Sequence, residues 1–472
     1  MKEKILFFSR MRLTEQYGEL NKHLINDFEC LHVPYDNFEE NILLTKYNLP
    51  SKYNMQSYLK NNLYSPSLTE LKELDLLILK YTNNRFNLNS SIQFDRGLKL
   101  LNLDDAYSIA YTYFIFWDNI FKKENVSYMF HETTSLFFNF IASVLSIKYD
   151  VIYSDMIKLP SNNNGFMFLS SSNAESLEFN RYYTTNIIDN TSVTKFSEFI
   201  ENKYKSIAPL NLNKSLFKTF ILVLKNELAI IKNKITKSKD IIYNNIDYYI
   251  LFHRKELKRF INLIAYKFIK WDTIKDEEFY FYPMHLEPEA VVQYWADGIY
   301  ENQIKLLENI ASQLPVGCYL YVKDHVIDYG YRNYSDYLKL KKIPNIKLID
   351  PTIRGTVLIK KAKAVITING TAGLEAMFFK KVVYSFGNIF YNKSKNVTYI
   401  NNIKDLRAEL YSDKEFDAED YKIFITSYIK SLYEGDTSWF TGAGTKIDDN
   451  VNIENIANSI KNFIKSINTD VV

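Results

Sequence analysis

The chain is poor in the residues on which several protein classes depend. Its 472 residues include only 2 Cys, 6 His, 13 Gly and 10 Pro. Cys30 and Cys318 lie far apart in the sequence, which excludes a disulfide framework and a cysteine-based zinc cluster. Two thiols outside such a framework fit a reducing compartment.

Long apolar runs and a strong charge of one sign are also missing. No stretch approaches the ~18 consecutive apolar residues of a transmembrane helix, and residues 5–8 are too short an apolar run for a signal peptide. We therefore expect a cytoplasmic protein, free or peripheral to the inner membrane. The 58 Lys and Arg against 55 Asp and Glu leave a net charge of +3, which gives no support to nucleic-acid binding.

Several catalytic motifs are absent as well. The sequence has no G-x-x-x-x-G-K-[ST] phosphate loop, no G-x-S-x-G elbow and no G-x-G-x-x-G fingerprint. The six His are scattered, without H-E-x-x-H or other paired metal spacing, so we expect neither a metal site nor a cofactor. ATPase, esterase and NAD-dependent dehydrogenase functions lose most of their support.

What the sequence does contain is an alternation of short apolar runs and helical segments. We expect strands at residues 5–8, 126–130, 150–153, 166–169, 279–282, 319–323, 346–349, 364–368 and 382–386. Helices are expected at residues 104–121, 133–147 (capped by Thr133, Thr134 or Ser135), 289–314 (broken near Gly298), 333–342, 352–362 and 374–379, while 74–79 fits a strand or a short helix. Such alternation predicts an α/β fold with parallel sheets covered on both faces.

The middle of the chain has a different composition. Residues 203–270 contain 15 Lys and Arg against 4 Asp and Glu, a net charge of +11, and they lack glycine. We therefore divide the chain into an N-terminal domain (1–200), a basic helical segment (201–275) and a C-terminal domain with terminal helices (276–472). The basic segment is either a solvated helical face or a binding surface for anionic lipid or anionic glycan.

The strongest local signal is the turn Gly370-Thr371-Ala372-Gly373, which follows a predicted strand and Asn369 and opens a helix that carries Glu375. A helix N-terminus at a strand end offers N–H groups and partial positive charge to a phosphate. Glu375, one turn into the helix, could accept hydrogen bonds from ribose hydroxyls. An ordinary strand-to-helix turn is the equal alternative.

Two further polar groups follow predicted strands. Lys323 and His325 at one strand end suit a phosphate leaving group, although a lone His is more often structural. His285 and Glu287 follow residues 279–282 and could lie on a loop at the mouth of the binding cleft, or Glu287 could simply stabilise a helix start.

In the N-terminal half, His131 and Glu132 follow the predicted strand 126–130. A carboxylate at a strand end could act as general base for an acceptor hydroxyl, with His131 tuning it. The alternative is a glutamate that only complements a helix dipole. Asp104, Asp105 and Asp118 are then the other candidates for the base.

Five blocks of the C-terminal half, taken in order, carry a resemblance to a known family. The blocks are Tyr282-Pro283-Met284-His285-Leu286-Glu287-Pro288-Glu289, Leu314-Pro315-Val316-Gly317, Tyr321-Val322-Lys323-Asp324-His325, 345–351, and 367–376 with its Asn369-Gly370-Thr371-Ala372-Gly373 core. Over residues 280–391 the chain resembles the capsule polysaccharide biosynthesis family, in particular the Kdo transferases of Gram-negative capsule assembly. Family members commonly have Lys-Glu-His-Pro where this chain has Lys323-Asp324-His325-Val326.

The resemblance implies a GT-B-like α/β architecture, with two Rossmann-like domains facing a cleft and a C-terminal domain that binds a nucleotide sugar. It implies a glycosyltransferase that transfers a 3-deoxy-ulosonic or nonulosonic acid from a CMP-linked donor to a glycan or lipid-linked glycan acceptor. His325 and the Gly370, Thr371 and Gly373 turn would lie at the donor phosphate or ribose, Glu375 near the ribose, and Glu132 on the acceptor side. Alternatives are a UDP- or GDP-sugar or polyol-phosphate transferase, or a non-catalytic capsule assembly or export protein.

Overall fold

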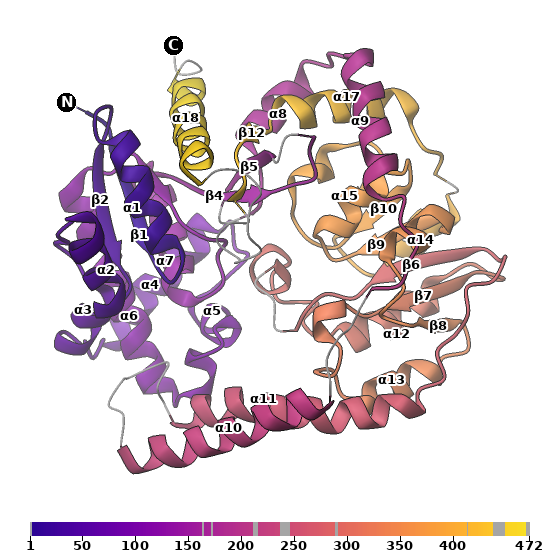
Figure 1. Cartoon of the computed structure of the whole chain (residues 1–472), viewed down its shortest axis with the longest axis horizontal. Helices are drawn as coiled ribbons and strands as arrows, with labels where there is room; N and C mark the ends of the chain where they lie inside the picture. Colours follow the sequence, from indigo (N-terminus) through magenta and orange to yellow (C-terminus); the bar gives the residue numbers. More distant parts are fainter. Residues whose placement is uncertain are drawn as a thin grey trace. The chain divides into compact units, whose positions relative to one another are not determined.

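The computed structural model describes residues 2–162, 165–170, 173–210, 216–236, 246–287, 291–412, 414–437 and 449–468 (Figure 1). The chain forms two compact units. Unit 1 contains residues 1–192 together with 425–472, and unit 2 contains residues 193–424. Each unit is built around one six-stranded sheet.

Unit 1 is an α/β unit with a mostly parallel sheet in the order β12-β5-β4-β3-β1-β2. Its strands are β1 (Lys4–Ser9), β2 (Glu29–Pro34), β3 (Tyr128–Phe130), β4 (Ile152–Lys158), β5 (Gly165–Ser170) and β12 (Tyr433–Glu434). Its helices are α1 (Leu13–Leu24), α2 (Asn37–Tyr47), α3 (Met55–Asn61), α4 (Leu68–Tyr81), α5 (Leu88–Phe94), η1 (Leu98–Leu100), α6 (Leu103–Glu124), α7 (Phe137–Lys148), α8 (Leu177–Thr184) and α18 (Asp449–Asn468). Strands β1 to β4 are parallel to one another, whereas β5 pairs antiparallel with both β4 and β12.

The two faces of this sheet are covered by different helices, as the alternation of side chains along a strand requires. Phe7 packs in a cluster with Tyr17 of α1 and with residues of α18. The next residue, Phe8, points to the other face, where its ring contacts Trp117 of α6 and Phe138 of α7. Strand β1 is therefore buried on both sides, which explains its continuous apolar run.

Unit 2 has an all-parallel sheet in the order β11-β10-β9-β6-β7-β8. Its strands are β6 (Phe279–Pro283), β7 (Tyr319–Lys323), β8 (Ile346–Ile349), β9 (Ala364–Thr367), β10 (Val382–Ser385) and β11 (Val397–Tyr399). Its helices are α10 (Leu216–Thr236), α11 (Ile246–Ala265), η2 (Tyr266–Phe268), η3 (Val291–Trp295), α12 (Gln303–Gln313), η4 (Val326–Asp328), α13 (Tyr334–Lys341), α14 (Gly355–Lys361), α15 (Thr371–Phe378), η5 (Phe390–Lys393) and α16 (Asp405–Tyr411). Helices α9 (Asn190–Lys203) and α17 (Ala418–Lys430) cross from one unit to the other along the chain.

The strand order of unit 2 creates a topological switch point. From β6 the chain moves outward to β7 and β8, and it then returns to β9 on the other side of β6. The loops after β6 and β9 therefore leave the sheet in opposite directions, and open α/β sheets bind ligands at this place. The predicted α/β class with two Rossmann-like units is confirmed by the two sheets.

The division of the chain differs from the boundaries expected from the sequence. Residues 425–472, which we expected in the C-terminal domain, belong to unit 1. The reason is packing: Ile453, Ile456 and Ile460 of α18 are buried against the sheet of unit 1. The basic segment expected at 201–275 is not separate, because α10 and α11 belong to unit 2.

Most predicted elements agree with the structure, with some changes at their ends. Residues 74–79 lie within helix α4. Helix α7 begins at Phe137 instead of Thr133, and its N-cap residue is Leu136, which provides no capping side-chain hydrogen bond. Asn139 accepts hydrogen bonds from the N–H groups of residues 135 and 136, and Asp95 accepts one from that of Phe137 at 2.7 Å. The expected helix 289–314 is a π-helical turn, η3, followed by α12, and residues 288–290 lie outside the described residues.

Candidate functional site

The switch point of unit 2 brings together two of the predicted site residues. His285 follows β6, and its Nε2 lies 3.2 Å from the hydroxyl of Thr367 at the end of β9. Gly370 has φ of +102°, a conformation that favours glycine, and an added Cβ would lie 3.3 Å from the His285 ring. Gly370 directly precedes α15, so the imidazole lies beside the N-terminus of this helix.

The same turn contains residues that have a packing role. A Cβ on Gly373 would collide with the hydroxyl of Tyr391, and that hydroxyl donates to the Gly370 carbonyl at 2.9 Å. Asn369 is fully buried, with its amide against Gly387. Thr371 is exposed and Ala372 is half-buried. The surface that a ligand can reach is therefore the first turn of α15, whose N–H groups have no acceptor within the helix.

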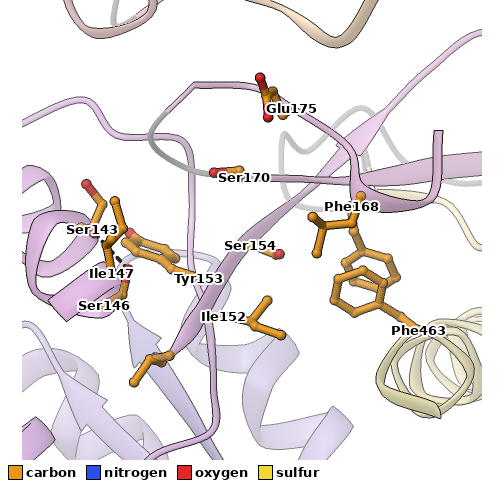
Figure 2. Close-up of a pocket in the computed structure, with 12 residues that line it drawn as sticks. Ser143, Ser146, Ile147, Ile152, Tyr153, Ser154, Phe168, Ser170, Glu175 and Phe463 are labelled. Atoms are coloured by element: carbon orange, nitrogen blue, oxygen red, sulfur yellow. Dashed lines mark hydrogen bonds between the residues drawn. The ribbon is translucent and has the colours of Figure 1, made fainter. Parts of the chain in front are cut away.

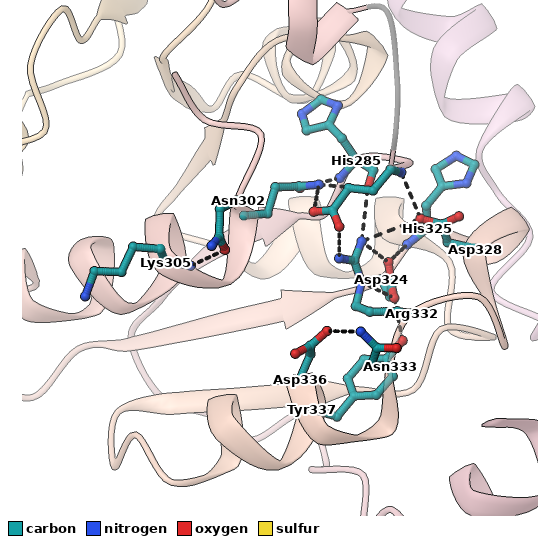
Figure 3. Close-up of polar contacts among 12 residues, drawn as sticks. His285, Asn302, Lys305, Asp324, His325, Asp328, Arg332, Asn333, Asp336 and Tyr337 are labelled. Carbon is teal, nitrogen blue, oxygen red and sulfur yellow. Dashed lines mark hydrogen bonds and ion pairs between the residues drawn. The ribbon is translucent and has the colours of Figure 1, made fainter. Parts of the chain in front are cut away.

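Arg332 holds the loops around this surface (Figure 3). Its side chain is 2% exposed and forms ion pairs with Asp324 after β7, at 2.8 Å, and with Glu287 after β6, at 2.8 Å. It also donates to the His285 carbonyl at 3.2 Å. Gln303, at the start of α12, accepts from the N–H of His285 and donates to Glu287 at 2.7 Å. Glu287 is therefore tied to the loop that carries His285.

Asp324 is a structural carboxylate at the centre of this network. It is 2% exposed, and besides Arg332 it accepts hydrogen bonds from the hydroxyl of Tyr337 and from the N–H of His325. The Nδ1 of His325 accepts a hydrogen bond from the N–H of Ile327 at 3.2 Å. In the neutral ring the proton therefore lies on Nε2, which makes that atom a donor.

Lys323 and Glu375 influence each other at the same edge of the sheet. Lys323 is buried, and burial lowers the pKa of its ammonium group, against the opposing effect of Asp324, Asp350 and Glu375. Burial raises the pKa of Glu375, and the hydroxyl of Tyr204, which donates to it at 3.0 Å, acts in the opposite direction. One oxygen of Glu375 is thus already engaged by this chain.

Unit 1 has its own charged pair at the ends of β1 and β3. Arg10 follows β1, and its guanidinium lies 2.5 Å from the carboxylate of Glu132, which follows β3. The guanidinium packs near the rings of Tyr35 and Phe138, at 5.4 and 5.3 Å. Glu132 remains 37% exposed, so its carboxylate is accessible to a ligand.

His131 is placed differently from Glu132. It is 1% exposed, its Nδ1 lies 2.9 Å from the carbonyl of Phe8, and burial lowers its pKa to about 4. Its Nε2 lies 3.7 Å from Glu132. A neutral imidazole has no charge with which to tune Glu132 at pH 7, and its Nδ1 contact joins the end of β3 to β1.

Asp155 is a second carboxylate beside this pair. It lies on β4 and accepts a hydrogen bond from the hydroxyl of Thr133 at 2.5 Å. Burial raises the pKa of Asp155 to about 6, and the negative charge of Glu132 contributes to this rise. Glu132 and Asp155 are therefore two carboxylates of different environment, since Asp155 is buried and Glu132 is partly exposed.

Several residues of these sites are not identified by the local sequence. Arg10 had a usable signal, since it is a charged residue directly after a buried strand. The local sequence gives no such signal for Arg332, Gln303 or Asp155. These residues lie in a loop, at a helix start and within a strand, respectively. Their roles follow only from the tertiary contacts.

A small cavity lies elsewhere in unit 1 (Figure 2). Its volume is about 180 Å³, and its lining includes Tyr153, Phe168 and the serines 143, 146, 154 and 170. Two of these hydroxyls donate to carbonyls of their own helix, Ser143 to Phe140 and Ser146 to Ser143. None of the residues that we selected from the sequence lines this cavity.

Two further features do not occur within the described ranges. No helix there is both long and apolar enough to cross a membrane. No group of three or more His, Cys, Asp and Glu residues suited to holding a metal ion occurs in that part of the chain.

Residues 198–433, half of the chain, match the family model described as capsule polysaccharide biosynthesis protein. The chain belongs to the capsule polysaccharide biosynthesis family. The matched residues of this family member include His285, Arg332 and Gly370, so the whole switch-point cluster lies within them. Glu132 and Arg10 lie outside the match.

Comparison with other known proteins adds little to this assignment. No curated protein matches the chain. KpsC of Thermosulfurimonas dismutans, a β-Kdo 2,7 transferase, is 10% identical over 90% of this chain and 89% of that chain, with a TM-score of 0.37. UDP-GlcNAc 2-epimerase of Methanocaldococcus jannaschii is 14% identical over 91% and 99%, with a TM-score of 0.28.

Replacing Arg332 by alanine should destabilise unit 2 strongly. The change leaves Asp324 buried without its ionic partner, which typically costs about 3–5 kcal/mol of the free energy of unfolding. Lys305→Ala is the matched control, because the pair of Lys305 with Glu308, at 3.0 Å, is exposed and should contribute at most about 1 kcal/mol. Urea denaturation of both variants measures the difference. An equally small loss for both would contradict the role of Arg332.

Asp155→Asn should change how stability depends on pH. Since the pKa of Asp155 rises from 3.8 to about 6 on folding, the native state binds this proton more tightly. The contribution of Asp155 to the free energy of unfolding therefore falls as pH rises from about 4 to 6, by about 3 kcal/mol at most. The variant should match the wild type near pH 4 and exceed it in stability above pH 6. Denaturation at a series of pH values measures this, and a constant difference would contradict it. The buried His131 is present in both proteins and cancels in the comparison.

Proposed function

We propose that the protein is a glycosyltransferase of surface polysaccharide assembly, which transfers a 3-deoxy-ulosonic or nonulosonic acid from a CMP-linked donor to a glycan or lipid-linked glycan. The observation that supports it most is the cluster of His285, Gly370 and the α15 N-terminus at the switch point of unit 2. This cluster lies within the residues that match the capsule family.

The proposed donor site uses the chemistry of a single phosphate. The N–H groups and dipole of α15 attract a phosphate, and Gly370 allows the backbone to approach it closely. The Nε2 of His325 donates to a phosphate oxygen as the bond between the sugar and that oxygen breaks. Because CMP leaves with one phosphate, we expect these groups to suffice without a metal ion. Lys323 and His285 add positive charge or hydrogen bonds at the neighbouring strand ends.

On the acceptor side we assign the base to Glu132. The acceptor hydroxyl gives its proton to the carboxylate while its oxygen bonds to the anomeric carbon of the sugar, and CMP leaves with the electron pair of the broken bond. Arg10 fixes the orientation of Glu132 through their ion pair. His131 is a positioning residue in this scheme, because it is buried and does not reach the substrate.

CMP should bind with an affinity that EDTA does not change, and more tightly than UDP, GDP or CDP. Titration calorimetry with the purified protein measures this. His325→Ala should lower kcat/KM by ~10²-fold or more, the scale of removing a donor to a developing charge, whereas the control His23→Ala in unit 1 should leave it unchanged. Tighter binding of UDP or GDP would favour another nucleotide-sugar transferase. Binding of no nucleotide would favour a non-catalytic assembly protein.

Glu132→Gln keeps the shape of the side chain and removes its charge. We expect transfer to fall by ~10²-fold or more, the scale of general base catalysis. CMP affinity should be unchanged, and the melting temperature should change little, because the pair with Arg10 is partly exposed. Glu15→Gln removes an exposed pair with Lys46 and serves as control. Retained transfer with a lower melting temperature would make Glu132 structural and return Asp104, Asp105 and Asp118 as candidates.

A further inference from the structure

Helices α10 and α11 carry large apolar side chains on their outer surfaces. On α10 five exposed apolar side chains, Phe217, Phe220, Ile221, Leu224 and Leu228, share one side of the helix, with Phe217 70% and Leu228 68% exposed, while Leu222, 41% exposed, lies off this side. The spacing of three, four and seven residues places them along one stripe. On α11 and η2 the exposed set is Leu257, Ile261, Ile264 and Phe268, which follows the same spacing, with Phe268 73% exposed. We call these two sets the apolar stripes.

The outward direction of the stripe on α11 is fixed by contacts on its opposite side. Asn262 is buried and donates to the carbonyls of Gly330 and Arg332, both at 2.9 Å. Arg259 is buried beside Glu256 and Tyr331. The helix cannot turn its apolar stripe inward without breaking these hydrogen bonds in a buried setting, which is costly.

The two helices also support each other. They run side by side (Figure 1), and the rings of Phe220 and Phe260 lie 5.8 Å apart. Val223 of α10 and Leu263 of α11 are buried. The helices therefore form a packed pair that holds apolar side chains toward solvent, a pattern that marks an interaction surface.

Positive charge lies beside the apolar stripes. On α10, Lys218 and Lys225 are exposed along one side of the stripe. On α11 and η2, Lys258 and Lys267 are exposed on opposite sides of the stripe. The surrounding residues 203–270 have a net charge of +11, against +3 for the whole chain. Exposed Phe, Leu and Ile flanked by Lys is the composition of helices that lie in the interface of an anionic membrane.

We propose that α10 and α11 dock the protein on an anionic lipid bilayer. The apolar stripes enter the boundary between headgroups and acyl chains, and the flanking lysines contact lipid phosphates. A protein partner would match the apolar area but leaves the surplus of positive charge unexplained, and a nucleic acid leaves the apolar stripes in water. This proposal does not depend on the nucleotide or the sugar that unit 2 binds.

The test is co-sedimentation of the full chain with vesicles of phosphatidylcholine alone or with 30% phosphatidylglycerol. The wild type should bind the anionic vesicles at least tenfold more strongly, and the preference should shrink as salt rises. The variant Leu224→Ser with Ile261→Ser should lose at least tenfold in binding to the anionic vesicles. The variant Lys218→Gln with Lys258→Gln should lose most of the preference for them.

Leu68→Ser with Leu76→Ser is the matched control, because both leucines are exposed on α4 of unit 1, at 68% and 65%. It should bind vesicles as the wild type does, and all variants should keep the wild-type melting temperature. Equal binding of the wild type to both vesicle types, or unchanged binding of the Leu224 and Ile261 variant, would overturn the proposal. Self-association that this variant abolishes, seen by sedimentation velocity without vesicles, would assign the surface to a second copy and also overturn it.

Discussion

The ion pair between Arg332 and Asp324 is the constraint on which the functional half of unit 2 depends. Both side chains are almost completely buried, and each makes several further hydrogen bonds. The free energy needed to remove two charges from water is about as large as the free energy gained from their attraction, so such a pair contributes little net stability. Its effect is on geometry: one guanidinium connects the loop after β6 with the end of β7. His285 and His325 keep their places because their loops are fixed at this one residue.

The same residue links the site to the α10–α11 surface. The carbonyl of Arg332 accepts hydrogen bonds from Asn262 of α11 and from Tyr266 of η2, while its side chain holds the loops of the site. A change at Arg332 therefore acts on the loops of the donor site and on the seat of α11 together. The same set of buried contacts therefore keeps the apolar stripe of α11 on its outer surface and holds the loop that carries His285.

The sequence predicted most strands of the two sheets and suggested candidate residues at their ends, but it did not predict which of these strands are neighbours. His285 and Gly370 each follow a predicted strand, 85 positions apart, and local patterns contain no information on which strands are neighbours. Their contact arises because β9 returns beside β6. The carboxylate of Asp95 accepts a hydrogen bond from the N–H of Phe137, the first residue of α7, although the two residues are 42 positions apart in the sequence. In the same way, the periodicity of α18 predicts a buried face but not the sheet that covers it.

Burial shifts the pKa values of ionisable groups in the same sense at the candidate sites of unit 1 and unit 2. It lowers the pKa of Lys323 and His131 and raises that of Asp155 and Glu375, so in each case burial favours the uncharged form. A bound anion beside Lys323 would favour its protonated form, and the same anion would favour protonation of Glu375. The low polarity of these sites disfavours the charged form of each group. It also strengthens the interaction of a charged group with a charged ligand, because water that enters the site would weaken this electrostatic contact.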